Sequence, residues 1–158
     1  HYDLSPAHLD TALAATLRDL GVSQVDTLML HRFDPRLDVD AFAGWAAAQR
    51  ELGTVRDVAV SNFPASALPL FTGKLSLTAH QIELSAAASQ ALDDGTHAAS
   101  RASGAEVQAW SPLGGGALLA DDDRGRALDA IAADVGLDRA GLLLRWVASL
   151  PATRVVLG

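Results

Sequence analysis

Apolar positions along the chain follow two spacings, one typical of helices and one typical of buried strands. After Ser5 and the proline that follows it, leucines recur every three or four residues, which predicts a helix that ends at Gly21. The apolar run VDTLMLH at residues 25–31 predicts a buried strand, and an alanine-rich stretch at residues 40–52 predicts the next helix. The chain therefore opens with helix, strand and helix in turn.

The alternation of strands and helices continues to the end of the sequence. Strands that alternate with helices form parallel sheets with helical crossovers, so the sequence predicts an α/β fold whose sheet is covered by helices. The other predicted strands lie at 55–63, 77–85, 105–110 and 153–158, and the other predicted helices at 96–103, 126–135 and 138–150.

Two architectures satisfy this order, a doubly wound sheet and a β/α barrel. A doubly wound sheet that binds a dinucleotide would carry the spacing G-x-G-x-x-G between a strand and a helix, and the sequence has no such spacing. The pattern therefore favours a barrel. In both architectures, ligands bind at the carboxyl ends of the strands.

Polar and aromatic residues gather where these ligand-binding ends are expected. A histidine at the end of an apolar strand is the clearest example, and its position favours a functional role over a purely structural one. The residues at the predicted strand ends are His31, Arg32, Ser61, Asn62, Gln81, Glu83, Trp110, Ser111 and Gly158.

Composition narrows the class of partner. Of the 158 residues, 49% are hydrophobic, enough to bury a core, and the formal net charge of -7 argues against nucleic acid or an anionic membrane. Cysteine is absent and neither a leader nor a long apolar stretch occurs, so we expect a cytoplasmic protein without a membrane segment. We interpret the aspartates at 121–123 as a solvated loop. No metal site is predicted, because no histidine spacing suits one.

Five motifs, in this order and spacing, resemble the aldo-keto reductases, which are NAD(P)H-dependent carbonyl reductases built on a (β/α)8 TIM barrel. The motifs are VDTLMLHR, GTVRDVAVSNF, HQIELS, AWSPLGGG and RVVLG, and the most similar branch comprises bacterial oxidoreductases with LHRPDP and SPLGGG motifs. A full barrel takes about 250 residues. The resemblance therefore implies one partial barrel domain over residues 1–158, roughly strands 4 to 8, without the N-terminal strands and the C-terminal cofactor loop.

The resemblance also implies roles for the strand ends. His31 matches the family histidine that hydrogen-bonds the substrate carbonyl, where a fixed donor stabilises the negative charge that hydride transfer places on oxygen. Arg32 is expected to line the mouth of the substrate site. Ser61, Asn62 and Gln81 match the residues that hold the nicotinamide carboxamide, a group that both donates and accepts, although turn chemistry alone also explains Asn62.

The stretch AWSPLGGG completes the implied cofactor site. Trp110 stands where many members stack a tyrosine on the nicotinamide, and the alternative for this residue is core filling. Ser111, Leu113 and Gly115 match the loop that runs along the pyrophosphate. The implied cofactor is NADP(H), with NAD(H) not excluded, because the family's adenosine-binding loop would follow the last residue.

Three members of the family's catalytic tetrad have no counterpart in the sequence. The tetrad is aspartate, tyrosine, lysine and histidine; Tyr2 follows the position of the family lysine, and Lys74 precedes a strand at the face opposite the chemistry. We therefore expect this piece of a barrel to be inactive alone. A partial barrel leaves unpaired strand edges at 25–31 and 153–157 and exposes the apolar side chains of the barrel interior to solvent. We therefore expect the chain to self-associate.

Three functions stay open. The first is an oxidoreductase segment that reduces an aldehyde or ketone, a small-molecule carbonyl substrate, to an alcohol. The second is a non-catalytic regulatory module that binds nicotinamide. The third keeps the barrel but uses His31 and Glu83 as acid and base of an isomerase or lyase.

Overall fold

Five strands form one parallel sheet in the order in which they occur along the chain. The structure is a computed structural model that describes residues 3–157, so Tyr2 and Gly158 lie outside the described residues. Every strand pairs in parallel with the next one along the chain. The strands are β1 Val25–Leu30, β2 Val55–Ser61, β3 Ala79–Glu83, β4 Glu106–Trp110 and β5 Thr153–Val155.

Helices begin and end where the local sequence supplies caps. The Ser5 hydroxyl accepts from the His8 N–H at the start of the first helix, and Gly21 ends that helix in the left-handed conformation, with φ 67°. The α-helices are α1 Pro6–Leu20, α2 Val39–Glu51, α3 Gln90–Asp93, α4 Thr96–Ala102, α5 Asp123–Asp134 and α6 Arg139–Ala148, and the 3-10 helices are η1 Ala65–Phe71 and η2 Gly114–Leu119.

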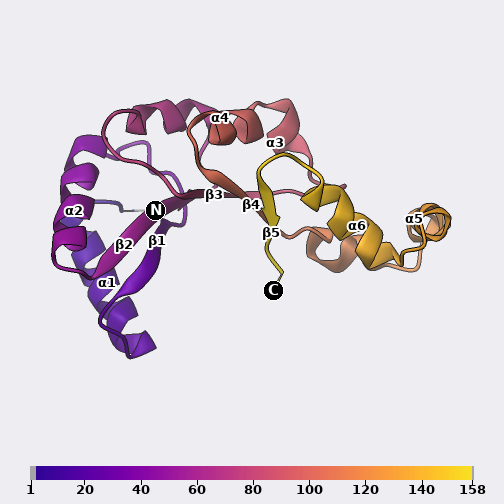
Figure 1. Cartoon of the computed structure of the whole chain (residues 1–158), viewed down its shortest axis with the longest axis horizontal. Coiled ribbons are helices and arrows are strands. Elements are labelled where there is room, and N and C mark those ends of the chain that lie inside the picture. The colour runs from indigo at the N-terminus through magenta and orange to yellow at the C-terminus, as the bar shows by residue number, and fades with distance from the viewer. Residues whose placement is uncertain (1–2, 158) are drawn as a thin grey trace.

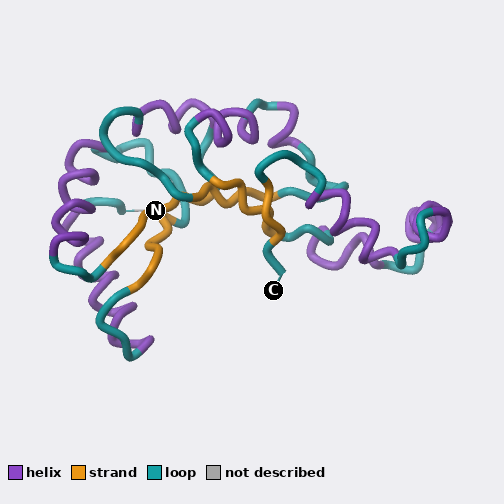
Figure 2. The backbone as a smooth tube through the Cα atoms, in the orientation of Figure 1, coloured by secondary structure: helices purple, strands orange, loops and turns teal. Residues whose placement is uncertain are grey.

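The sheet is bent into an arc. The helices lie along its outer side, and the strands form the inner lining (Figures 1 and 2). Among the described residues, no helix crosses the inner, concave side. This arrangement of strand and helix units is that of a barrel wall that has not closed, as the sequence predicts.

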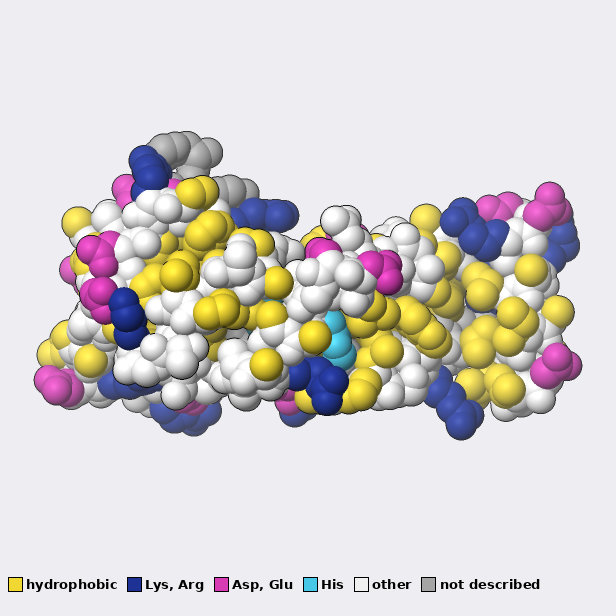
Figure 3. Space-filling model, turned by 90° about the horizontal axis from the view of Figure 1, so that it is seen from above, with side chains coloured by type: hydrophobic (Ala, Val, Ile, Leu, Met, Phe, Trp, Pro, Cys, Tyr) yellow, Lys and Arg dark blue, Asp and Glu magenta, His cyan; other side chains and the backbone are white. Residues whose placement is uncertain are grey.

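Two hydrophobic clusters hold the helices against the outer side of the sheet. The first packs α1 and α2 on β1 and β2, and its buried members include Leu13, Phe42, Val58 and Val60. The second packs α6 on β3 and β4 around Val107, Val147 and their neighbours. Because side chains alternate along a strand, the residues between these apolar positions face the concave side. Figure 3 looks onto the helix-covered side, where apolar side chains are spread along the face and charged side chains lie at both ends and near the middle.

The concave side of the sheet is mostly polar, which limits the exposed apolar lining expected from the sequence. The strands hold the half-buried Met29 and Trp110, but the large hydrophobic side chains that are exposed within residues 3–157 lie outside them. Instead a polar row crosses three strands. Gln81 donates to Gln108 (3.2 Å), Gln108 donates to Glu106 (3.3 Å), and Arg154 donates twice to Glu106 (2.8 and 2.9 Å).

The two outer strands keep free edges. Within the described part of the chain, β1 pairs only with β2, and β5 pairs only with β4. Free strand edges are templates for further pairing. As a separate finding, none of the described helices has the length and apolar character needed to cross a membrane.

Candidate active site

The residues singled out in the sequence lie at the carboxyl ends of neighbouring strands. His31 directly follows β1, Ser61 is the last residue of β2, and Trp110 is the last residue of β4. Gln81 lies within β3 rather than at its end, and its register partner is Ser61. The bend of the parallel sheet therefore brings residues far apart in sequence to one rim.

Asn62 joins three of these strand ends through its side-chain amide. Its Nδ2 donates to the backbone oxygen of His31 (3.3 Å) and to the hydroxyl of Ser61 (2.8 Å). Its Oδ1 accepts from the indole N–H of Trp110 (3.0 Å). These contacts fix which way the amide points and hold the indole ring of Trp110 at the rim.

The backbone at this rim adopts a costly conformation in two places. Asn62 and Ser111 each have φ 56°, in the left-handed region that most side chains avoid. Asparagine tolerates this region better than other residues, and the N–H of Asn62 is tied to the backbone oxygen of Gln81 (2.9 Å). Such conformations persist only where the surroundings enforce them, and they concentrate at functional sites.

The polar row beside this cluster supplies ligand-binding groups. Ser61 is buried, with 2% of its surface exposed, and Gln81 is half-buried. The Gln81 amide nitrogen donates to Gln108, which leaves the amide oxygen as an acceptor on the concave side. At the far end, the hydrogen bonds from Arg154 lower the pKa of Glu106, which keeps this carboxylate ionised.

A cavity of about 530 Å³ opens between the end of β4 and the residues after β5. The glycine stretch that forms one wall needs glycine for its backbone, because Gly115 and Gly116 have φ 62° and 90°. The N–H groups of Gly114 and Gly116 donate to oxygens of the same loop, so these two donors are already engaged. The lining residues are Trp110, Ser111, Pro112, Leu113, Gly115, Gly116, Val156 and Leu157.

Other predicted residues stand apart from the cluster. The side chains of His31, Arg32 and Glu83 are exposed, and only the backbone of His31 joins the network around Asn62. Lys74 pairs with Asp40 in the first turn of α2 (2.7 Å), which places it in the helix layer. That Lys74 takes no part in the chemistry stays a prediction.

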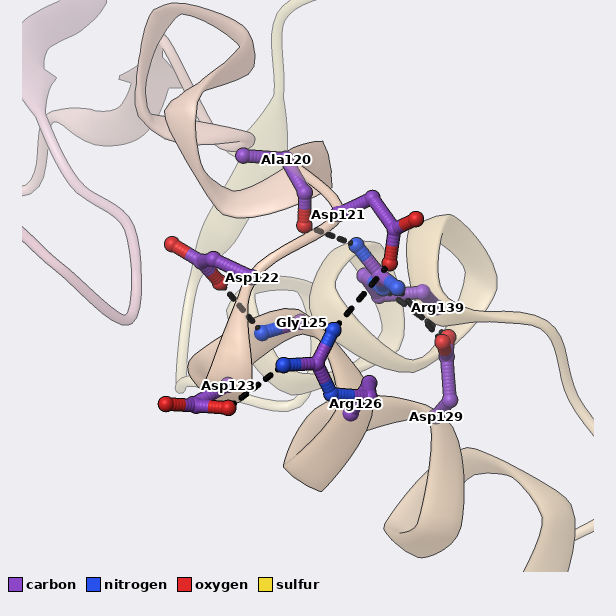
Figure 4. Close-up of polar contacts among 8 residues, drawn as sticks. All are labelled: Ala120, Asp121, Asp122, Asp123, Gly125, Arg126, Asp129 and Arg139. Atoms are coloured by element: carbon purple, nitrogen blue, oxygen red, sulfur yellow. Dashed lines mark hydrogen bonds and ion pairs between the residues drawn. The ribbon is translucent and has the colours of Figure 1, made fainter.

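The acidic run at 121–123 is engaged with arginines (Figure 4). Asp122 caps α5 by accepting from the Gly125 N–H (2.7 Å), and this bond lowers the pKa of the Asp122 carboxyl. Asp123 and Asp121 pair with Arg126. Arg139 spans the junction, donating to the Ala120 oxygen and to both oxygens of Asp129. Across residues 3–157, no group of side chains has the makeup of a metal site.

Sequence reasoning missed one polar residue beneath the site, His80. It is fully buried on the helix-covered side of β3, at the register position of the apolar residues Val60 and Val107. The strand motif HQIE contained the signal. Its histidine lies two residues before a buried isoleucine, so both side chains point to the same face, and a histidine on that face must find hydrogen-bond partners inside the core.

The chemistry of the rim fits a nicotinamide cofactor. A carboxamide needs a donor and an acceptor. The Ser61 hydroxyl can donate, and the amide oxygens of Asn62 and Gln81 can accept, on one side of the sheet. Trp110 presents an aromatic ring beside the cavity, where a planar heterocycle can stack.

Comparison with known proteins gives consistent results. A family model described as the Aldo/keto reductase family matches residues 1–157. The 6-dehydroglucose reductase of Agrobacterium fabrum (strain C58) is 35% identical over 163 residues, which cover 100% of this chain and 55% of that protein. Oxidoreductase YdhF of Escherichia coli (strain K12) is 31% identical, over 96% of this chain and 53% of its own length.

A solved structure shows the same fold at lower identity. The thermostable aldo-keto reductase Tm1743 superposes with a TM-score of 0.84 and 23% identity, over 96% of this chain and 56% of that one. The five-stranded arc is thus part of a (β/α)8 barrel, and the chain spans about half the length of these relatives. Fold, motif order and the match over residues 1–157 agree: the chain belongs to the aldo/keto reductase family.

Proposed function

We propose that this chain carries the nicotinamide platform and the carbonyl-orienting histidine of an NAD(P)H-dependent reductase that converts an aldehyde or ketone to an alcohol. The observation that supports this most directly is the Asn62 network, which joins His31, Ser61 and Trp110 beside Gln81. When bound, the reduced nicotinamide supplies the hydride. The exposed imidazole of His31 would donate to the carbonyl oxygen that gains the electron pair, and an acid outside this chain would supply the proton.

The first test is NADPH binding. Asn62→Ala and Gln81→Ala should each weaken the affinity for NADPH about tenfold, a loss of about 1.4 kcal/mol. Gln81→Ala removes hydrogen bonds to the carboxamide. Asn62→Ala removes one acceptor together with the bonds that hold Ser61 and Trp110 in place. Quenching of tryptophan fluorescence during an NADPH titration measures the affinity, since Trp110 lies at the site.

The matched control is Gln24→Ala. Gln24 donates to the Gly53 oxygen at the opposite end of β1 and β2, so its loss should leave NADPH affinity unchanged. If all three variants lost NADPH affinity equally, Asn62 and Gln81 would not be the residues that hold the nicotinamide. If the unaltered protein did not bind NADPH, the proposed function would be wrong.

The family and the geometry favour a reductase over the isomerase or lyase alternative. Turnover distinguishes an enzyme from a non-catalytic module that only binds nicotinamide. It is measured as NADPH oxidation with the protein that carries this chain. Because the Agrobacterium relative is named 6-dehydroglucose reductase, an oxidised sugar is the first carbonyl to try. Turnover that persists when His31 is replaced by alanine would contradict the role proposed for His31.

The free edges of β1 and β5 also support self-association of the isolated chain. We expect sedimentation at micromolar concentration to give species heavier than a 16.4 kDa monomer. A single monomeric boundary over this concentration range would contradict the expectation.

A further inference from the structure

A buried histidine lies directly beneath the turn that carries Asn62. His80 has no exposed surface, and its ring bridges two segments of the chain. Its Nδ1 lies 2.7 Å from the Ser100 hydroxyl in α4, and its Nε2 accepts from the Phe63 N–H at 3.1 Å. The ring therefore links an outer helix to the residue that immediately follows Asn62.

The hydrogen bonds around His80 define one tautomer. The Ser100 hydroxyl donates its single proton to the Thr96 backbone oxygen (2.7 Å), so toward His80 this hydroxyl can only accept. Nδ1 must then carry the ring proton. Nε2 is left with a lone pair, which is what the Phe63 N–H requires. Burial lowers the pKa of His80 to about 4, so the ring stays neutral at pH 7 and this pattern persists.

Two successive backbone amides at the site are held by β3. The Asn62 N–H donates to the Gln81 oxygen, and the Phe63 N–H donates to the ring of the preceding strand residue, His80. Together they hold the turn in which Asn62 has φ 56°. If the second bond were lost, Asn62 could relax toward an ordinary conformation and its amide would turn away from Trp110.

We propose that His80 is a positioning residue: by accepting from the Phe63 N–H, it fixes the turn that aims the Asn62 amide at Ser61, His31 and Trp110. Its effect on cofactor binding rests on the function proposed above. Its effect on the turn and on the Trp110 indole does not, so the two can be tested separately.

Two substitutions of His80 separate the two ring nitrogens. In His80→Gln, the longer amide reaches the place of Nε2 and can still accept from Phe63. In His80→Asn, the shorter amide reaches the place of Nδ1, toward Ser100, and leaves the Phe63 N–H unpaired. We expect His80→Asn to abolish the hydrogen-exchange protection of the Phe63 amide and to shift the indole N–H resonance of Trp110. His80→Gln should retain both and bind NADPH about tenfold more tightly than His80→Asn.

The matched control is His97→Asn. His97 is also a buried histidine, but it contacts Thr153 through Nε2 (3.0 Å), away from the Asn62 turn. A general loosening of the core would change Phe63 and Trp110 equally in His97→Asn and His80→Asn, and that result would overturn the proposal. So would an unchanged Trp110 resonance in His80→Asn.

A milder variant covers the case in which His80→Asn does not fold. Ser100→Ala removes the acceptor of the Nδ1 proton, so the ring is no longer anchored to α4 and its bond to the Phe63 N–H weakens. Reduced protection of the Phe63 amide is expected, and full protection would overturn the proposal. If the Phe63 and Trp110 signals respond as expected while the unaltered protein binds no NADPH, the positioning role stands and the proposed function fails.

Discussion

Replacing Gly125 with alanine should lower the free energy of unfolding by roughly 3 kcal/mol. A Cβ at this position would lie 2.1 Å from the Ala120 backbone oxygen and 2.5 Å from Nη1 of Arg139. Neither neighbour can give way cheaply, because the oxygen accepts from Arg139 and the guanidinium is also held by Asp129 (Figure 4). The methyl group would therefore push the start of α5 away from the end of the glycine loop.

Chemical denaturation of the variant against the parent measures this cost. Gly44→Ala is the matched control: Gly44 lies within α2, and a Cβ there would meet nothing within 4 Å. That change should raise stability by about 0.5–1 kcal/mol, because alanine favours a helix over glycine. If Gly125→Ala unfolded at the same denaturant concentration as the parent, the close approach of α5 and Ala120 would be wrong.

Acidification from pH 7 to pH 4.5 should remove about 2–3 kcal/mol of stability through His80 alone. Burial lowers the folded-state pKa of His80 to about 4, whereas the unfolded chain titrates near 6.5. Between these values the unfolded state binds more protons than the folded state, so stability falls as pH drops from about 6.5 to about 4. Burial also lowers the pKa of His97, which acts in the same direction.

Urea unfolding at pH 7 and pH 4.5 measures the loss, and His80→Gln isolates it. The variant cannot titrate at this position, so the loss of stability between pH 7 and pH 4.5 should shrink by about 2–3 kcal/mol. The carboxyls whose pKa values are lowered, such as those of Asp34 and Asp129, lose their contribution only below their ordinary range near pH 4. An equal pH dependence in parent and variant would mean that His80 is not buried in a neutral state.

Much of the fold was predictable because its signals are local. The spacing of Leu9 and Leu13 with caps at Ser5 and Gly21 gave α1, and apolar runs gave all five strands. Short elements without a period escaped prediction: η1, with Pro69 inside it, the four-residue α3, and η2 within the glycine loop. Helix α5 starts three residues before the predicted position, because Asp122 caps it.

The residues of the site could be predicted from the sequence, but the hydrogen bonds that join them could not. Strand-end position marked Ser61, Asn62 and Trp110, yet the bond between Trp110 and Asn62 spans 48 residues of sequence, and only the bend of the sheet creates it. The engaged N–H groups of the glycine loop follow from dihedral angles that no sequence pattern specifies. His80 depends on partners in two other segments.

The sequential strand order has a consequence for how this chain folds. Within residues 3–157, each strand pairs only with its neighbours along the chain, so no pairing has to wait for a distant segment. Closing a short loop costs less conformational entropy than closing a long one, and folds rich in such contacts form faster. The sheet can therefore grow one strand at a time while the chain is being synthesised, each newly emerged strand docking on the edge left by the one before.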